Sequence, residues 1–494
     1  MPVPDNREEL GASAKWTTRA QVNGYLFLVH RLVHALVQRD VRMLHDPMRA
    51  QARSLSIGVV LAILGTCTSL ILAFVRPQGA IGDSTIFVGK SSGALYVKLH
   101  DELHPVLNLA SARLITGAAE NPTSIADAKL ASLPRGPIMG IPGAPQALPG
   151  PAGTASNWAL CDALPAESGP SGVPTTTVIA APPRLGPDSG GLRPDQALLV
   201  TRDTTTYLLY DGKRARVDPA DPVMAEALGL KPGLARPVSA GLLDSTVAVP
   251  PLAPPQIPQV GGLGVWRYGG LRIGTVIEVQ HINSTDYYVI VPEGIQQISA
   301  FAAEVLRDAN STGTAQITAV PPDALQGAPV VDTIPMGWFP TTRPDIVTAD
   351  RAPVICSAWA TAGDNTRATL RLLTGESLPL GPAQKPVDMV AAGQDGSANS
   401  VYLPPTTGIY VQATGIEPGS TRRDSLFYVA DNGVRYGIPD AATAKMLGFD
   451  GPPQPAPWQI LGRLVPGPTL SRSAALVNRD TLVDPAQRVA DQTR

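Results

Sequence analysis

The longest apolar run of the chain lies between Ser54 and Val75, where no charged residue occurs. A helix of that length covers about 33 Å, enough to cross a hydrocarbon core of about 30 Å. A buried core helix rarely stays apolar on every face over such a length. No cleavage pattern of a signal peptide follows the run. The pattern therefore predicts one transmembrane helix over residues 54–75.

A second apolar pattern precedes this run and is amphipathic. Thr18 and Gln21 match a capping box, and Pro47 is expected to end or bend the helix before the membrane. Such a short segment cannot build its own core, so its apolar face should pack on a partner protein or lie on the membrane surface. The residues of this face are spaced alternately four and three apart: Val22, Leu26, Val29, Val33 and Leu36.

Beyond residue 76, four stretches resemble one another, beginning at Ala94, Tyr207, Tyr288 and Phe427. Each combines an aromatic-rich strand, a turn, a second strand and a short amphipathic helix. The turn pairs Asp211-Gly212 and Asn432-Gly433 favour hairpins because these residues accept a positive φ. The predicted fold class is α+β, with one transmembrane helix and an elongated exoplasmic domain of four hairpin-plus-helix modules around a central β domain.

The expected domains follow from these patterns and from connectors rich in Pro and Gly. The connectors are residues 136–152, 163–193, 247–260 and 451–457. The expected order is a cytoplasmic arm (1–53), the transmembrane helix (54–75), module 1 (76–135), a connector with part of the central domain (136–195), module 2 (196–260), module 3 (261–325), the rest of the central domain (326–415), and module 4 with the C-terminal tail (416–494).

Charge is informative locally rather than globally. The net charge is -2 and charged residues make up 16% of the chain, so nothing indicates a nucleic-acid partner. The N-terminal flank of the apolar run carries Arg39, Arg42, Arg49 and Arg53, whereas only Arg76 is close on the other side. The positive-inside rule therefore predicts a cytoplasmic N-terminus and an exoplasmic C-terminal domain.

The cysteines divide into one and two. Cys67 lies in the apolar run, where it serves as a small hydrophobic residue. Cys161 and Cys356 lie in the exoplasmic part, where an even pair is usually bonded, so we expect a disulfide between them. The alternative is two buried free thiols. Closing so long a loop with a disulfide would remove about 5 kcal/mol of chain entropy from the unfolded state in the simple model.

Candidate chemistry is sparse. Gly89-Lys90-Ser91 resembles the end of a phosphate-binding loop, but that loop needs a glycine at position 84, which is Ser. The same segment matches a nucleophile elbow, yet a strand-like run follows where an elbow needs a helix. We expect a hairpin turn there. His30 and His34 have the spacing of metal ligands, but no third ligand is evident. No catalytic, metal-ligating or cofactor-binding residue is predicted, and the sequence leans against an enzyme.

Several motifs together resemble the EccB family, the membrane-core component of mycobacterial type VII (ESX) secretion systems. They occupy residues 21–27, 41–43, 108–117, 140–145, 161–162 and 467–471. The resemblance implies a single-pass inner-membrane protein whose periplasmic domain has four repeat modules and a central disulfide. It also implies homo-oligomerisation through that domain and assembly with EccC (an FtsK-like ATPase), EccD and EccE.

The expected function is therefore structural: the chain scaffolds protein export across the inner membrane. Two alternatives stay open. One is a membrane-anchored hydrolase of nucleotides or cell wall, since some relatives are labelled ATPases, although no nucleotide-binding loop is present here. The other is an anchor that binds peptidoglycan.

Overall fold

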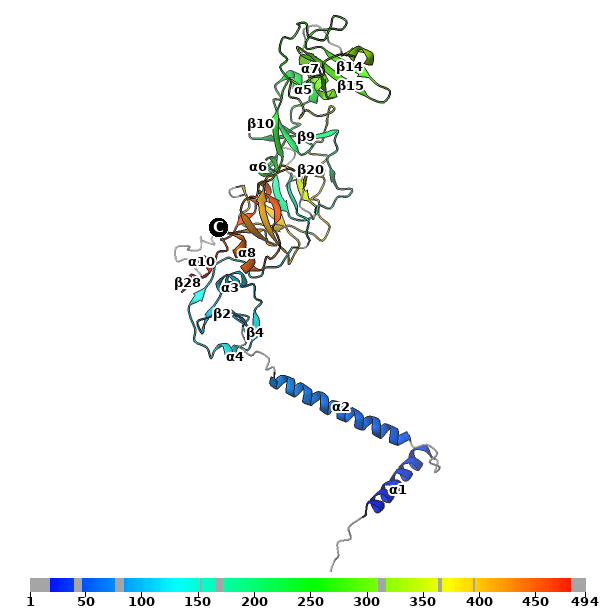
Figure 1. The fold of residues 1–494 in the computed structure, drawn as a ribbon, viewed down its shortest axis with the longest axis vertical. Helices are drawn as coiled ribbons and strands as arrows, with labels where there is room; N and C mark the ends of the chain where they lie inside the picture. The colour runs from blue at the N-terminus through cyan, green and yellow to red at the C-terminus, as the bar shows by residue number, and fades with distance from the viewer. Residues whose placement is uncertain are drawn as a thin grey trace, which may run out of the picture. The chain divides into compact units, whose positions relative to one another are not determined.

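The computed structural model describes residues 18–39, 47–75, 84–151, 153–165, 172–309, 317–362, 367–393 and 396–480. The chain divides into two compact units, Met1–Ala80 and Ile81–Arg494. The described part of the first unit is helical, and the second unit is built mainly from strands (Figure 1).

The first unit contains α1 (Arg19–Gln38) and α2 (Pro47–Val75). The predicted capping box is present, because the Thr18 amide donates to Gln21 Oε1 at 2.9 Å. The expectation for Pro47 is wrong: it begins α2, where its missing N–H would have no helical partner anyway. Hydropathy picks out one candidate membrane span among the described residues, Arg53–Leu72, within α2.

The four modules of the second unit share one chain path. Each begins with three antiparallel strands and a helix, and then adds a strand that pairs in parallel with the first strand. A second short helix or 3-10 turn follows, after which the chain pairs in parallel with the third strand. In modules 1 and 3 this last pairing is a single bridge, Leu103–Arg135 and Ile295–Val330. The predicted hairpin plus helix is therefore only part of the repeating unit.

The bounds of the module elements are as follows. Module 1 has β1 (Ile86–Gly89), β2 (Leu95–Leu99), β3 (Glu102–Pro105), α3 (Leu109–Thr116), β4 (Thr123–Ile125) and α4 (Asp127–Leu130). Module 2 has β9 (Gln196–Arg202), β10 (Thr205–Tyr210), β11 (Lys213–Val217), α5 (Pro222–Leu228), β12 (Arg236–Pro237), α6 (Ala240–Asp244) and β13 (Val247–Leu252). Module 3 has β14 (Val276–Gln280), β15 (Thr285–Val291), β16 (Gly294–Ile298), α7 (Ala300–Ala309), β17 (Thr318–Ala319) and η2 (Pro322–Leu325). Module 4 has β23 (Gly408–Thr414), β24 (Leu426–Ala430), β25 (Val434–Ile438), α8 (Ala441–Leu447), β26 (Gln454–Pro457), α9 (Trp458–Leu461) and β27 (Val465–Pro466).

The central domain is one seven-stranded sheet in the order β21-β22-β7-β6-β19-β20-β8. Cys161 of β6 lies directly opposite Cys356 of β19, and the two form the predicted disulfide. The bounds of its strands are β6 (Asn157–Ala163), β7 (Thr175–Ile179), β8 (Ser189–Gly191), β19 (Val354–Thr361), β20 (Ala368–Gly375), β21 (Val387–Asp388) and β22 (Ser400–Tyr402).

Two expected boundaries move in the structure. The first strand of module 4, β23, pairs with β24, so this module begins at Gly408 rather than at residue 416. Strand β18 (Asp345–Ile346), expected in the central domain, pairs in parallel with β9 of module 2. The remaining elements are β5 (Ile138–Met139), its partner β28 (Asn478–Arg479), and α10 (Arg472–Ala475), which packs on α3.

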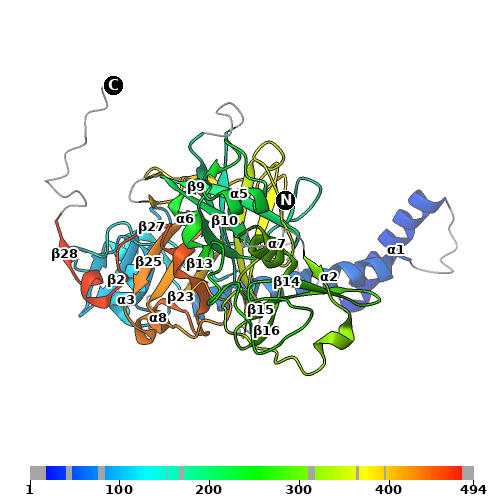
Figure 2. The same cartoon turned by 90° about the horizontal axis from the view of Figure 1, so that it is seen from above.

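Shared hydrophobic cores join the modules in an order that differs from the chain order. Helix α3 packs on α8 and joins module 1 to module 4, while α5 packs on α7 and joins module 2 to module 3 (Figures 1 and 2). A third core joins modules 2 and 4 to one face of the central sheet. Along the second unit the order is therefore module 1, module 4, central sheet, module 2 and module 3.

Local sequence signals account for much of this path. Asp211 and Gly212 both have positive φ, 44° and 70°, as a two-residue hairpin turn requires. Asp221 and Asp440 accept backbone N–H bonds at the starts of α5 and α8, and glycines in the left-handed conformation follow both helices.

Prolines mark the edges of the sheets of modules 2 and 4. The edge strands are β12 and β13 in module 2, and β26 and β27 in module 4. They contain Pro237, Pro250, Pro251, Pro455, Pro457 and Pro466. Proline has no N–H to donate, so these edges resist the addition of a further strand.

Candidate functional site

The described residues converge most clearly where modules 2 and 4 meet on the central sheet. The second helices of these modules, α6 and α9, pack against each other and against β6. Leu242 of α6, Ile460 of α9 and Leu160 of β6 are fully buried there. This module junction joins the module pair 2–3 to the module pair 1–4.

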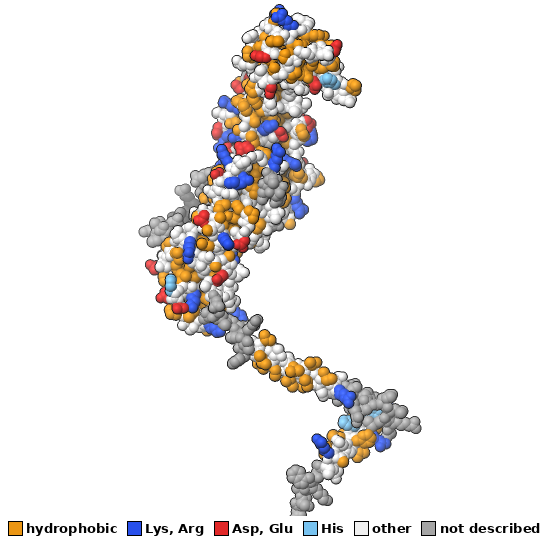
Figure 3. Space-filling view, in the orientation of Figure 1, with side chains coloured by type: hydrophobic (Ala, Val, Ile, Leu, Met, Phe, Trp, Pro, Cys, Tyr) orange, Lys and Arg blue, Asp and Glu red, His pale blue; other side chains and the backbone are white. Residues whose placement is uncertain are grey.

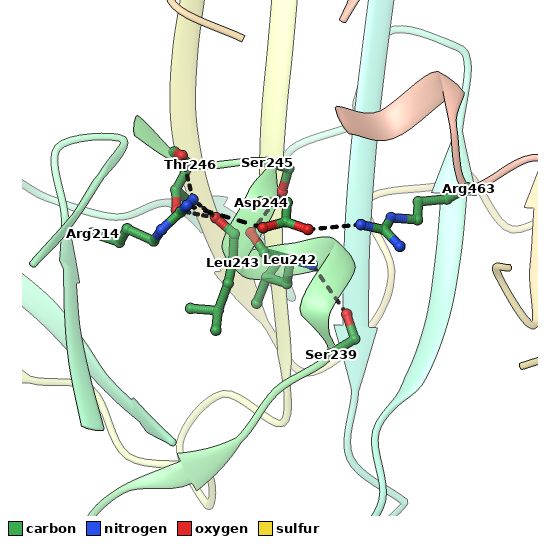
Figure 4. Close-up of polar contacts among 8 residues, drawn as sticks. All are labelled: Arg214, Ser239, Leu242, Leu243, Asp244, Ser245, Thr246 and Arg463. Atoms are coloured by element: carbon green, nitrogen blue, oxygen red, sulfur yellow. Dashed lines mark hydrogen bonds and ion pairs between the residues drawn. The ribbon is translucent and has the colours of Figure 1, made fainter. Parts of the chain in front are cut away.

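Asp244, the last residue of α6, lies between two arginines of different modules (Figure 4). Its Oδ2 is 2.7 Å from Nη2 of Arg463 in module 4, and its Oδ1 is 4.0 Å from Nη2 of Arg214 in module 2. Arg214 also donates to the carbonyl oxygens of Leu243 and Thr246, the latter at 2.8 Å. The carboxylate therefore couples the end of α6 to the returning chain of module 4.

The start of α6 is held by the central sheet. The Ser239 side chain caps α6 by accepting from the Leu242 amide at 3.0 Å, and the Ser239 amide donates to Asp162 Oδ2 at 2.6 Å. Thr176 donates to the other oxygen of Asp162 at 2.8 Å. Burial of Asp162, which directly follows Cys161, raises the pKa of its carboxyl above the ordinary value.

Arg236 of β12 holds module 2 to the segment that leads into β19. Its side chain is buried and donates to the carbonyl oxygens of Ala352 and Pro353. Burial lowers the pKa of Arg236 to about 10, against an attraction to Asp162 that favours the charged form. Module 2 and the segment that returns from module 3 to the central sheet are thus held together by Arg236.

Another arginine joins module 1 to module 4. Nη1 of Arg113 in α3 donates to the carbonyl oxygen of Leu447 at the end of α8, at 2.6 Å. Its Nε and Nη2 donate to Glu120 and Asn121 at 3.1 Å each. Partial burial lowers the pKa of Arg113, and because these donors have acceptors the guanidinium stays fixed between the two helices.

The segment around Lys90 is a hairpin turn between β1 and β2, as the sequence predicts, and does not form a phosphate-binding loop. The Ser91 amide and the Ser92 hydroxyl both donate to the carboxylate of Asp127, the amide at 2.8 Å. The Asp127 carboxylate thus occupies both donors, and its negative charge would repel a phosphate.

The predicted docking face of α1 is open. Val22, Leu26, Val29 and Leu36 are exposed, and Val33 is partly exposed. His34 is buried. Among the described residues no group of three or more His, Cys, Asp or Glu side chains could hold a metal ion. In Figure 3 hydrophobic side chains are spread along the visible face of α2.

Sequence reasoning identified the two cysteines but missed the junction residues. Asp244 and Arg463 are 219 positions apart and belong to no local motif. The one available signal was the dipeptide Cys161-Asp162, which contributed to the family resemblance. Its aspartate holds α6 in place.

Comparison with known proteins matches this architecture to one family. The family described as "Type VII secretion system ESX-1, transport TM domain B" matches residues 14–484. The chain belongs to the EccB family.

Relatives of known sequence cover nearly the whole of this EccB chain. It is 38% identical to the ESX-3 secretion system ATPase EccB3 of Mycolicibacterium smegmatis, over 97% of this chain and 94% of the relative. It is also 38% identical to the ESX-2 secretion system ATPase EccB2 of Mycobacterium tuberculosis, over 94% of this chain and 96% of the relative.

Solved structures agree with the fold of this EccB chain. A chain of an intact ESX-5 inner membrane complex is 33% identical with a TM-score of 0.73, and the match covers 97% of this chain and all of that one. The EccB3 dimer from the ESX-3 core complex is 37% identical with a TM-score of 0.71, covering 80% of this chain and all of that one. This EccB is therefore a structural component of a type VII secretion system, a single-pass subunit of an oligomeric inner membrane complex.

Proposed function

We propose that this EccB chain is a structural link that connects the cytoplasm to a periplasmic assembly. In this arrangement residues before α2 are cytoplasmic and the second unit is periplasmic. The excess of arginine before the membrane span supports this orientation, with Arg31, Arg39 and Arg53 among the described residues. The disulfide supports it too, because disulfides persist in oxidising compartments.

The proposed partners are EccC, EccD and EccE, with EccC as the ATP-hydrolysing motor. The observation that carries the proposal is the joining of all modules through shared cores and the module junction. Modules joined in this way hold fixed positions relative to one another, as a scaffold requires. The relatives bear the word ATPase in their names. In this chain the Asp127 carboxylate occupies the turn at Ser91, which favours hydrolysis of ATP by a partner subunit instead.

Two surfaces serve contacts outside the chain in this proposal. The apolar face of α1, formed by Val22, Leu26, Val29, Val33 and Leu36, makes the contact on the cytoplasmic side, with a partner subunit or with the membrane surface. The periplasmic modules mediate self-association. Binding of peptidoglycan by the modules is a second candidate role, tested by sedimentation of residues 81–494 with purified cell wall.

Extraction of the tagged protein in mild detergent, followed by native electrophoresis and mass spectrometry, tests the proposal. We expect a megadalton-scale species that contains an FtsK-like ATPase and a multi-spanning subunit. A small species without partners would contradict it. Orientation is tested separately with a membrane-impermeant thiol reagent on intact cells, using the double substitution Cys67→Ser and Thr18→Cys. That cysteine should react only after the membrane is permeabilised.

A further inference from the structure

Helix α1 exposes an apolar face that nothing in the described chain covers. The exposed fractions of Tyr25, Leu32 and Leu36 are 69%, 64% and 72%. The helix and its C-cap carry three arginines and no acidic residue, and the nearest acidic residues are Asp40 and Asp46 in the connection to α2. A cationic helix with a broad apolar face fits a surface in which anionic groups lie over an apolar layer.

The three arginines differ in their position relative to the apolar face. Val29 lies near the middle of the face, and Arg19 and Arg39 are each ten residues away from it. At about 100° per residue, ten residues bring a side chain to about 80° on one side or the other. Arg19 at the start of α1 therefore borders the apolar face, and Arg39 caps the other end of the helix in the left-handed conformation. Arg31, two residues from Val29, lies on the opposite side of the helix.

The chain also keeps α1 close to the membrane. Eight Cα steps separate Arg39 from Pro47, and at about 3.5 Å each they reach no further than about 28 Å. From Pro47, six helical residues lead to Arg53, where the candidate span begins, a rise of about 9 Å. So short a tether holds the apolar face at a high effective concentration next to the lipid surface.

We propose that α1 lies on the cytoplasmic leaflet, with its apolar face among the acyl chains and Arg19 and Arg39 on anionic phospholipid headgroups. The side of the membrane rests on the orientation proposed above. Lipid is favoured over a groove in another protein because arginines lie at both ends of the helix and have no acidic counterpart on it. Long cationic side chains at the rim of a buried face reach headgroups in this geometry.

The test uses the full chain in nanodiscs, with Cys67→Ser as background and an environment-sensitive fluorophore on Leu32→Cys. Asn23→Cys is the matched control position, because nine residues place Asn23 and Leu32 about 180° apart on the helix. Both positions are exposed. The nanodiscs contain either phosphatidylglycerol with phosphatidylcholine or phosphatidylcholine alone. Because a nanodisc leaves both lipid faces open, the result does not depend on the orientation in the cell.

With phosphatidylglycerol, we expect the Leu32→Cys label to shift to the blue and to be quenched by brominated acyl chains, while the Asn23→Cys label stays in water. Arg19→Gln and Arg39→Gln should each lower the ratio of bound to free helix about fivefold, the effect of about 1 kcal/mol for one arginine at an anionic surface. Arg31→Gln is the charge-matched control and should change this ratio little.

Two results would overturn the proposal. In one, the Leu32→Cys label stays in water in both lipid mixtures and becomes protected only when purified partner subunits are added. In the other, protection is equal without phosphatidylglycerol and insensitive to Arg19→Gln and Arg39→Gln. Either result leaves the scaffold function intact, since the native-complex experiment decides that separately.

Discussion

Arg463 of module 4 lies 2.7 Å from Asp244 of module 2, at the centre of the second unit. The pair joins residues 219 positions apart, at the point where the two module pairs meet on β6. The ion pair adds a polar contact at the rim of the apolar packing between α6 and α9.

Breaking this pair should weaken the coupling between the module pairs. The Asp244 side chain is 47% exposed, so solvent screens the interaction and we expect Asp244→Asn to cost about 1 kcal/mol or less. A double-mutant cycle with Arg463→Met, measured by urea unfolding at low and high salt, gives the pair energy. Disrupting the local surface pair Arg193–Asp195 is the control and should have no effect on the contact between α6 and α9. Additivity of Asp244→Asn and Arg463→Met would contradict the coupling.

The disulfide should stabilise the second unit substantially. Cys161 and Cys356 are separated by 195 positions, and closing such a loop corresponds to about 5 kcal/mol in the chain-entropy model, an upper figure. We expect the double substitution of both cysteines by serine to lower the urea midpoint strongly and to make unfolding insensitive to reductant. The wild type should lose stability on reduction. Equal midpoints with and without reductant would show that the bond contributes nothing.

Asp162 should make stability depend on pH in a particular direction. Its pKa is raised in the folded protein, so the folded state binds the proton more readily than the unfolded state. The contribution of Asp162 to the free energy of unfolding therefore increases as pH falls towards the unfolded pKa, and it decreases as pH rises through the folded pKa. The difference between wild type and Asp162→Asn, measured by urea unfolding from pH 7 to pH 4, should grow at the acidic end.

At neutral pH, Asp162→Asn should also destabilise modestly. Asparagine keeps an acceptor for the Ser239 amide, and its amide group faces the Thr176 hydroxyl, which can rotate to accept. We expect about 1 kcal/mol, because hydrogen bonds to a neutral amide are weaker than those to a carboxylate. A pH-independent difference between wild type and variant would argue against titration of Asp162 in this range.

Lys90 should be dispensable for nucleotide chemistry. The turn that holds Lys90 and Ser91 binds the Asp127 carboxylate, so neither Lys90→Ala nor Ser91→Ala should change ATP turnover by the purified complex. Magnesium and ATP should not raise the melting temperature of residues 81–494. Loss of turnover in either variant, with the melting temperature of the protein unchanged, would revive the hydrolase hypothesis.

The sequence predicted the parts of the fold that have strong local signals. The turns at Asp211-Gly212 and Asn432-Gly433, the apolar run of α2 and the capping box at Thr18 each depend on neighbours in the chain. The strands that follow the helices were mistaken for connectors or missed. Strand β12 has two residues, one of them proline, and β26 alternates prolines with other residues. Parallel pairing with a distant strand creates these elements, and no local propensity reveals it.

The module junction lay beyond sequence reasoning for a related reason. The spatial order of the modules places module 4 beside module 1, although two modules and the whole central sheet separate them in the chain. Asp244 and Arg463 become neighbours only through this return path. Their residue types are ordinary for exposed helix ends, so a single sequence gives no reason to single them out.

The prolines along the outer strands of modules 2 and 4 have a consequence for how related subunits recognise one another. One bacterium, Mycobacterium tuberculosis, has EccB relatives from several ESX systems. Backbone pairing between sheet edges would be indifferent to side chains and would let mismatched copies join. With those edges closed by Pro237, Pro251, Pro455 and Pro466, contacts made by these modules depend on side chains. Each system can then vary its surfaces to exclude foreign copies while every module retains the same backbone.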